Sequence, residues 1–117
     1  MVGGKYFLQR EGDTASSTYK ENVEVIAEVA AQHPVTAGGG SLRMEDELYK
    51  GMWISLDVKV LLTTSSPISD KAIAWVSPYP RSRVVYVQSG HGPGAHRYPG
   101  YRKLVHNALL WTAGRLN

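Results

Sequence analysis

Apolar and polar residues alternate over residues 22–29 of this chain. The apolar positions are Val23, Val25, Ala27 and Val29. A period of two residues is typical of a strand with one buried face. Glu, Ala and Ile in the same stretch would also suit a helix, but three β-branched valines at this spacing favour the strand. The pair His33-Pro34 ends it, since proline disfavours helix before it and cannot donate to a ladder.

Four other stretches have the composition of strands, namely residues 5–10, 58–64, 72–76 and 83–88. Residues 77–82 contain two prolines and read as the loop of a hairpin between the last two. Residues 83–88 are apolar on both sides, which predicts a strand that is buried on both faces. Residues 42–48 mix leucine and methionine with three acids, and we interpret them as an irregular extended piece followed by a turn.

The clearest element is a C-terminal helix over residues 99–113. Pro99 suits the first helical turn, and Gly114 is a good residue to end the helix. Apolar residues recur every three or four positions at Tyr101, Leu104, Val105, Ala108, Leu109 and Trp111. We therefore predict an α+β fold with a mixed β-sheet of about five strands, on which this helix packs around Trp111.

Composition narrows the function classes. A chain of 117 residues and 12.9 kDa has the size of a single domain, residues 1–117. With no cysteine there is no thiol nucleophile, disulfide or thiolate metal site. A net charge of +3 is too small to indicate nucleic-acid binding. The solvent-exposed face of the predicted helix accounts for the basic residues Arg97, Arg102, Lys103 and Arg115. The first residues lack a signal-peptide core and no long apolar run follows, so we expect a cytoplasmic protein that does not enter a membrane.

Candidate chemistry concentrates in the loop of residues 89–96, which follows a predicted strand and leads into the helix. Ligands of open α/β sheets collect at such strand ends, and glycines let backbone approach them closely. His91 is the better functional candidate, whereas His96 is expected at the surface. The alternative is that this segment only reverses the chain direction and that both histidines are exposed to solvent without a function. Two histidines are too few ligands for a metal, so no metal and no cofactor is predicted.

The acidic run Glu45-Asp46-Glu47 is the one carboxylate cluster in the sequence. A carboxylate that faces His91 could orient its imidazole for acid–base chemistry, although such a run is more often a solvated loop. Trp75 and Tyr79 lie near strand ends. They could pack in the core, or they could offer the flat apolar surface that sugar rings prefer.

Several blocks in order resemble one family. They are His33-Pro34-Val35-Thr36-Ala37-Gly38, Glu45-Asp46-Glu47-Leu48-Tyr49, Ala72-Ile73-Ala74-Trp75-Val76 with Tyr79, Arg83-Val84-Val85-Tyr86, Gly90-His91-Gly92, and Tyr101-Arg102-Lys103-Leu104 to Asn107, Trp111, Gly114 and Arg115. Together they are similar to a trehalose-utilisation (ThuA-like) domain, a family of the class I glutamine amidotransferase-like, flavodoxin-type architecture that is linked to carbohydrate metabolism. The chain resembles the C-terminal half of that module, which implies a truncated α/β fold.

The resemblance implies a site. His91 would act as acid, base or hydrogen-bond donor, Glu47 or Asp46 would orient it, and the substrate would contact Tyr49, Trp75, Tyr79, Gly90 and Gly92. One hypothesis is a pocket protein of sugar metabolism with a carbohydrate ligand, and enzymatic activity is left open. The other is a non-catalytic interaction module of the same fold. In either case we expect a homodimer, or a partner chain that supplies the missing half, because one helix covers one sheet face only.

Overall fold

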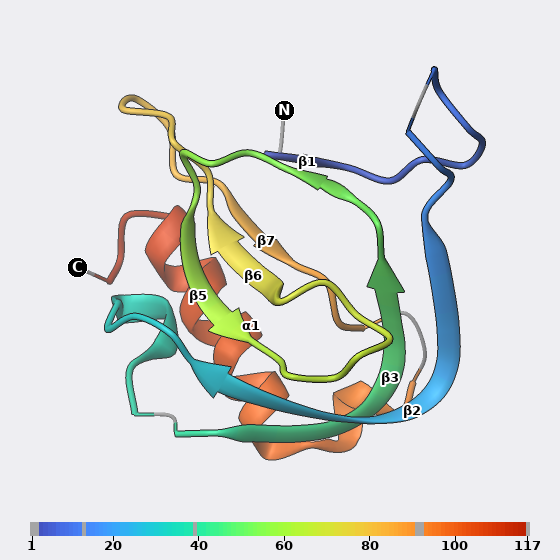
Figure 1. The fold of residues 1–117 in the computed structure, drawn as a ribbon. Helices are drawn as coiled ribbons and strands as arrows, with labels where there is room; N and C mark the ends of the chain where they lie inside the picture. Colours follow the sequence, from blue (N-terminus) through green and yellow to red (C-terminus); the bar gives the residue numbers. More distant parts are fainter. Residues whose placement is uncertain (1–2, 13, 39, 91–92, 117) are drawn as a thin grey trace.

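A computed structural model describes residues 3–12, 14–38, 40–90 and 93–116 of the chain (Figure 1). Its regular elements are β1 (Gly4–Lys5), β2 (Thr18–Val29), the 3₁₀ turn η1 (Pro34–Thr36), β3 (Leu42–Lys50), β4 (Trp53–Ile54), β5 (Lys59–Thr63), β6 (Ala72–Val76), β7 (Val85–Val87), the 3₁₀ turn η2 (Ala95–Arg97) and the helix α1 (Pro99–Thr112). Five strands form one sheet in the order β3-β2-β5-β6-β7, and β1 pairs with β4 in a separate two-stranded ribbon.

The two longest strands, β2 and β3, form an antiparallel pair that sweeps around one side of the molecule (Figure 1). The alternation read from residues 22–29 is confirmed, since Val25 and Ala27 are fully buried while Glu24 and Ile26 face solvent. β3 corrects the prediction of an irregular segment over residues 42–48. Its inward positions continue through the acidic run and end at Leu48, so a strand forms in spite of the charged residues.

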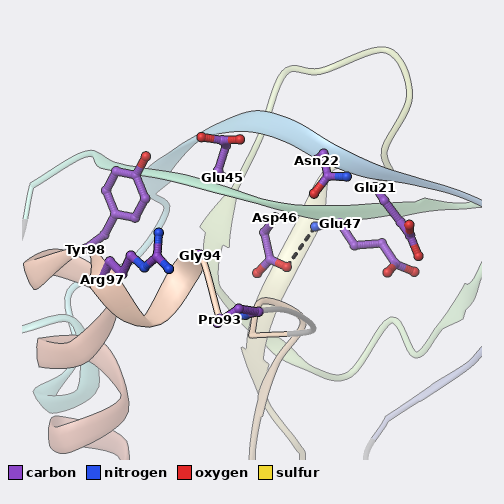
Figure 2. A pocket seen from close by; sticks show the side chains of 9 residues that line it. All are labelled: Glu21, Asn22, Glu45, Asp46, Glu47, Pro93, Gly94, Arg97 and Tyr98. Carbon is purple, nitrogen blue, oxygen red and sulfur yellow. Dashed lines mark hydrogen bonds between the residues drawn. The ribbon is translucent and has the colours of Figure 1, made fainter.

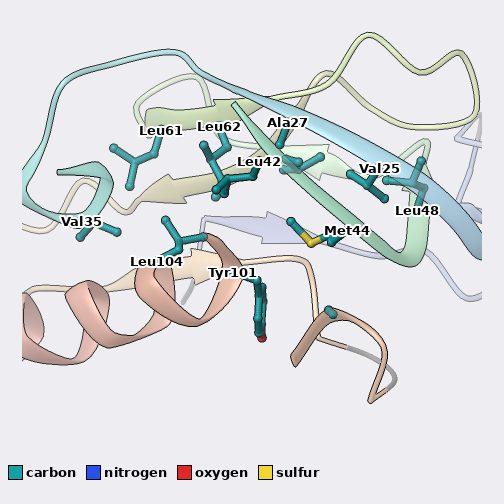
Figure 3. Close-up of a cluster of buried hydrophobic side chains, with 13 residues drawn as sticks. Val25, Ala27, Val35, Leu42, Met44, Leu48, Leu61, Leu62, Tyr101 and Leu104 are labelled. Carbon is teal, nitrogen blue, oxygen red and sulfur yellow. The ribbon is translucent and has the colours of Figure 1, made fainter. Parts of the chain in front are cut away.

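The hydrophobic core lies between the sheet and α1 (Figure 3). α1 contributes Tyr101 and Leu104 from its buried face, and its start lies so close to β3 that a Cβ atom on Gly100 would come 2.5 Å from Leu42 Cδ2. The sheet contributes Val25, Ala27, Leu42, Met44, Leu48, Leu61, Leu62, Ile73 and Ala74. The predicted helix is thus confirmed almost to the residue. Trp111, however, is only partly buried, and it packs at the margin of this core.

The α+β class with a five-stranded sheet and one C-terminal helix is confirmed. The sheet is antiparallel in every recorded pairing instead of mixed, because loops and no crossover helix connect its strands. β7 lies at the sheet edge and is half-buried, so the expectation of cover on both faces is wrong for residues 83–88. Of the first predicted strand, residues 5–10, only Lys5 belongs to an observed strand, which it forms with Gly4, and Leu8 is 89% exposed.

Within the described ranges, no helix has both the length and the apolar character that crossing a bilayer requires.

Candidate functional site

A cavity of about 390 Å³ opens where β2 and β3 pass the segment that leads into α1 (Figure 2). Its volume lies within the range of roughly 300–1,000 Å³ that is usual for small-molecule sites. Its lining residues come from three places in the sequence: Glu21 and Asn22 from β2, Glu45, Asp46 and Glu47 from β3, and Pro93, Gly94, Arg97 and Tyr98 from the last connection. The acidic run of the sequence therefore lines a cavity and is not a solvated loop.

A β-bulge shapes the sheet wall of this cavity. The register of the pair shifts between Lys20, which lies opposite Leu48, and Val23, which lies opposite Asp46. Glu21 and Asn22 together therefore oppose the single residue Glu47. Asn22 has a φ of 54°, a left-handed conformation that asparagine tolerates better than most residues. The bulge brings the Glu21 side chain to the same end of the cavity as Glu47 (Figure 2).

Asp46 is buried, with 6% of its surface exposed, and backbone N–H groups hold its carboxylate. Oδ1 accepts the N–H of Glu47 at 2.8 Å, and Oδ2 accepts the N–H of Gly90 at 2.5 Å. Both carboxylate oxygens are thus engaged by the protein itself. The second bond joins β3 to the loop after β7, so Asp46 fixes the position of that loop.

Tyr101 holds the same loop from the helix side. Its hydroxyl donates to the carbonyl of Ser89 at 3.3 Å, and a Cβ atom on Gly90 would clash with it. Gly90 also has a φ of +109°, so only glycine fits this position without strain. The pKa of Tyr101 is raised above its usual value, mainly by burial and to a smaller extent by the nearby negative charge of Asp46.

Glu47 and Tyr49 interact on the other face of β3. Glu47 has 6% of its surface exposed. The pKa of Tyr49 is raised far above its usual value, first by burial, then by its hydrogen bond to Glu47 and by that carboxylate's charge. The phenol thus stays protonated and donates to Glu47. The ring of Tyr6 meets that of Tyr49 edge-on, with centroids 5.8 Å apart, which fixes the ring position.

The wall that faces the carboxylates comes from η2 and the start of α1. Arg97 ends η2, and Tyr98 is the residue from which α1 begins. Figure 2 shows both side chains on the side of the cavity away from Glu21 and Glu47. Among the described lining residues Arg97 carries the one positive charge, against four carboxylates. The cavity therefore offers hydrogen-bond acceptors on one wall and donors on the other.

The predicted site residues divide into three groups. Asp46 and Glu47 line the cavity, while Gly90 and Tyr49 lie directly behind it. His91 and Gly92 fall outside the described residues. Trp75 and Tyr79 lie elsewhere: Trp75 is fully buried and stacked on Tyr86 at 4.2 Å, and Tyr79 follows the far end of β6.

Sequence reasoning missed four lining residues, namely Glu21, Asn22, Arg97 and Tyr98. The one available signal was Asn22, a weak strand former at the start of a strongly alternating stretch, which is typical of a bulge. His96 is exposed as expected, with its ring edge-on to Tyr101 at 5.0 Å. Across the described ranges no three His, Asp or Glu side chains are grouped in a way that could hold a metal ion.

Comparisons with known proteins bear on the family and the fold. The sequence profile of a family described as trehalose utilisation (ThuA) matches residues 1–112. The crystal structure of a ThuA-like protein from Parabacteroides merdae ATCC 43184 has a similar fold, with a TM-score of 0.74 and 19% sequence identity. That similarity covers 99% of this chain and 50% of the other, so this chain spans half of the matched protein's length. No match was found among curated proteins.

Proposed function

The chain belongs to the trehalose-utilisation (ThuA) family, and from that premise we propose that its acidic cavity binds a carbohydrate or a related polyhydroxylated small molecule. The observation that carries the proposal is the convergence of Glu21, Glu47 and Arg97 around one cavity of about 390 Å³. Sugar hydroxyls donate and accept hydrogen bonds at once, so they suit a site with carboxylate acceptors facing a guanidinium donor.

Each residue has a distinct part in this proposal. Glu47 and Glu21 accept hydrogen bonds from vicinal hydroxyls, Arg97 donates to a ring or hydroxyl oxygen, and Tyr98 offers an aromatic face. Asp46 does not face the ligand as a free acid or base, because both of its oxygens are engaged by backbone N–H groups. It positions the loop after β7 instead. For His91 we keep the role that the family resemblance implies, an acid, base or donor toward the same ligand.

A thermal-shift titration with D-glucose, trehalose and the keto sugar D-fructose tests the proposal. We expect at least one sugar to raise the melting temperature of the wild-type protein, since a ligand that binds only the folded state stabilises it. Glu47→Gln should abolish the shift. Glu28→Gln is the matched control, because Glu28 is an exposed residue of β2 outside this cavity.

Two results would refute carbohydrate binding at this site. One is a wild-type protein that none of the sugars stabilises at concentrations far above typical sugar affinities. The other is a Glu47→Gln variant that responds to sugar as the wild type does. If Glu28→Gln lost the response together with Glu47→Gln, the effect would come from overall charge and not from the cavity.

Self-association is a second proposal, and the sheet edge favours it. Among the described strands β7 pairs with β6 alone, so its outer edge presents backbone groups that a second copy of the chain could pair with. On the exposed side of β2, Tyr19 is 61% and Ile26 is 53% exposed. We propose a twofold homodimer, which light scattering would detect as a particle of twice 12.9 kDa. A single 12.9 kDa species at micromolar concentration would refute it.

A further inference from the structure

A second cavity, of about 420 Å³, lies at the opposite end of the sheet from the acidic one. It opens between the loop that joins β6 to β7 and the last turn of α1. β6 and β7 are antiparallel, with Val76 opposite Val85, so this loop projects from one end of the pair. Gly90 follows the other end. Tyr79, which the sequence assigned to the sugar site, lines this second cavity.

Arg83 is fixed in the wall of this cavity. Its guanidinium lies over the ring of Trp111, 4.9 Å from the centroid, and its Nη1 donates to the Trp111 carbonyl at 2.8 Å. Nη1 also donates a longer hydrogen bond to the carbonyl of Leu116. These are the two hydrogen bonds that the Arg83 side chain makes within the described residues, and Nη1 is the donor in both. A guanidinium has five N–H donors, so those on Nε and Nη2 remain to bind an anion. Stacking holds them in place before any ligand arrives.

Among its described lining residues, this cavity carries positive charge only. Its described lining contains Arg81 and Arg83 but no aspartate or glutamate. The two ion pairs found in the described residues, Lys5–Glu11 and Arg43–Glu24, involve neither arginine. The pKa of the neighbouring His33 is lowered by burial and then by the charges of Lys59 and Arg83, which supports a positive potential at this end.

An aromatic surface accompanies the positive charge. Tyr79 is 40% exposed, and it lies in the same loop as Arg81 and lines the same cavity. A free aromatic face stacks well on a planar or ring-shaped ligand. We propose that this cavity binds a phosphate ester of a ring compound, with the phosphate between Arg81 and Arg83 and the ring against Tyr79. Arginine suits this ligand because its planar donors match phosphate oxygens.

Calorimetric titration of the whole chain with AMP tests the proposal, with inorganic phosphate and adenosine as the two part-ligands. We expect AMP to bind more tightly than either, because each lacks half of the contacts. Arg81→Ala should weaken AMP binding by about tenfold, the effect of one lost charge-assisted hydrogen bond. Arg81 is exposed in a loop, so circular dichroism should show this variant folded.

Arg102→Ala is the matched control, since it removes an exposed arginine at the start of α1, away from this cavity. It should bind AMP as the wild type does. The proposal is overturned if millimolar AMP gives no binding, if adenosine binds as tightly as AMP, or if Arg81→Ala and Arg102→Ala weaken AMP equally. A failure of AMP to bind leaves the carbohydrate proposal unchanged, because that proposal concerns the other end of the molecule and is tested with neutral sugars.

Discussion

Replacing Asp46 with alanine is the sharpest test of how the site is held together. The change removes a carboxylate that is 6% exposed and that accepts the N–H groups of Glu47 and Gly90. A hydrogen bond to a charged group contributes about 1.5–3 kcal/mol, and a buried donor left without its acceptor costs about 1–3 kcal/mol. The Glu47 N–H borders the cavity, where water can replace the carboxylate. We therefore expect Asp46→Ala to lower the free energy of unfolding by about 3–4 kcal/mol.

Urea denaturation followed by circular dichroism measures this loss, and amide hydrogen exchange locates it. The Gly90 amide should exchange much faster in the variant, because its acceptor is gone. Glu45→Ala is the control on the same strand: Glu45 is exposed and lines the same cavity, so its loss should change stability by less than about 0.5 kcal/mol. A loss below about 1 kcal/mol for Asp46→Ala, or unchanged exchange at Gly90, would show that the carboxylate does not hold the loop.

Three other predictions concern α1 and its neighbours. Tyr101→Phe removes the donor to Ser89 and should lower stability by about 1 kcal/mol in the urea assay, whereas an unchanged midpoint would contradict this role. His33 has a lowered pKa, so the unfolded state binds its proton first as pH falls, and stability should decrease from pH 6.5 down to that lowered pKa. His33→Asn, which retains a capping side chain, should lose this slope. Trp111→Ala should cost about 2–3 kcal/mol, below the range for a fully buried tryptophan, because Trp111 is partly buried under Arg83, and a loss above about 4 kcal/mol would place its ring in the core.

Local sequence patterns predicted the elements in which buried apolar side chains recur at the regular spacing of a strand or a helix. Residues 72–76 form β6 as predicted, and α1 begins at Pro99 and runs to Thr112, one residue short of the predicted end. β3 was missed because Asp46 occupies an inward position where a strand pattern expects an apolar residue. One of the two N–H groups that compensate its burial belongs to Gly90, which is far away in the sequence. A periodicity argument contains no information about such a partner.

The site shows the same division between local and distant information. The resemblance pointed to Asp46, Glu47 and Gly90, which the fold brings together, and it also grouped them with Trp75 and Tyr79, which the fold keeps apart. The sequence shows that a residue lies near the end of a strand, but it does not show at which end of the folded sheet that residue lies. Whether two such ends meet depends on strand order, and here the antiparallel β6–β7 pair sends Tyr79 and Gly90 in opposite directions.

The net charge of +3 does not show that negative and positive side chains gather at different ends of the sheet. The order of the strands produces this separation. The bulge in β2 gathers carboxylates beside β3, whereas the β6–β7 loop gathers arginines near the end of α1. The two cavities lie at opposite ends of the sheet, so each is surrounded mainly by its own sign of charge. Because salt screens exposed charges beyond about 10 Å, the potential in each cavity is set mainly by the charges that line it. A composition that alone indicates little about ligands therefore contains two cavities of opposite charge, for which we propose a neutral polyol and an anion as ligands.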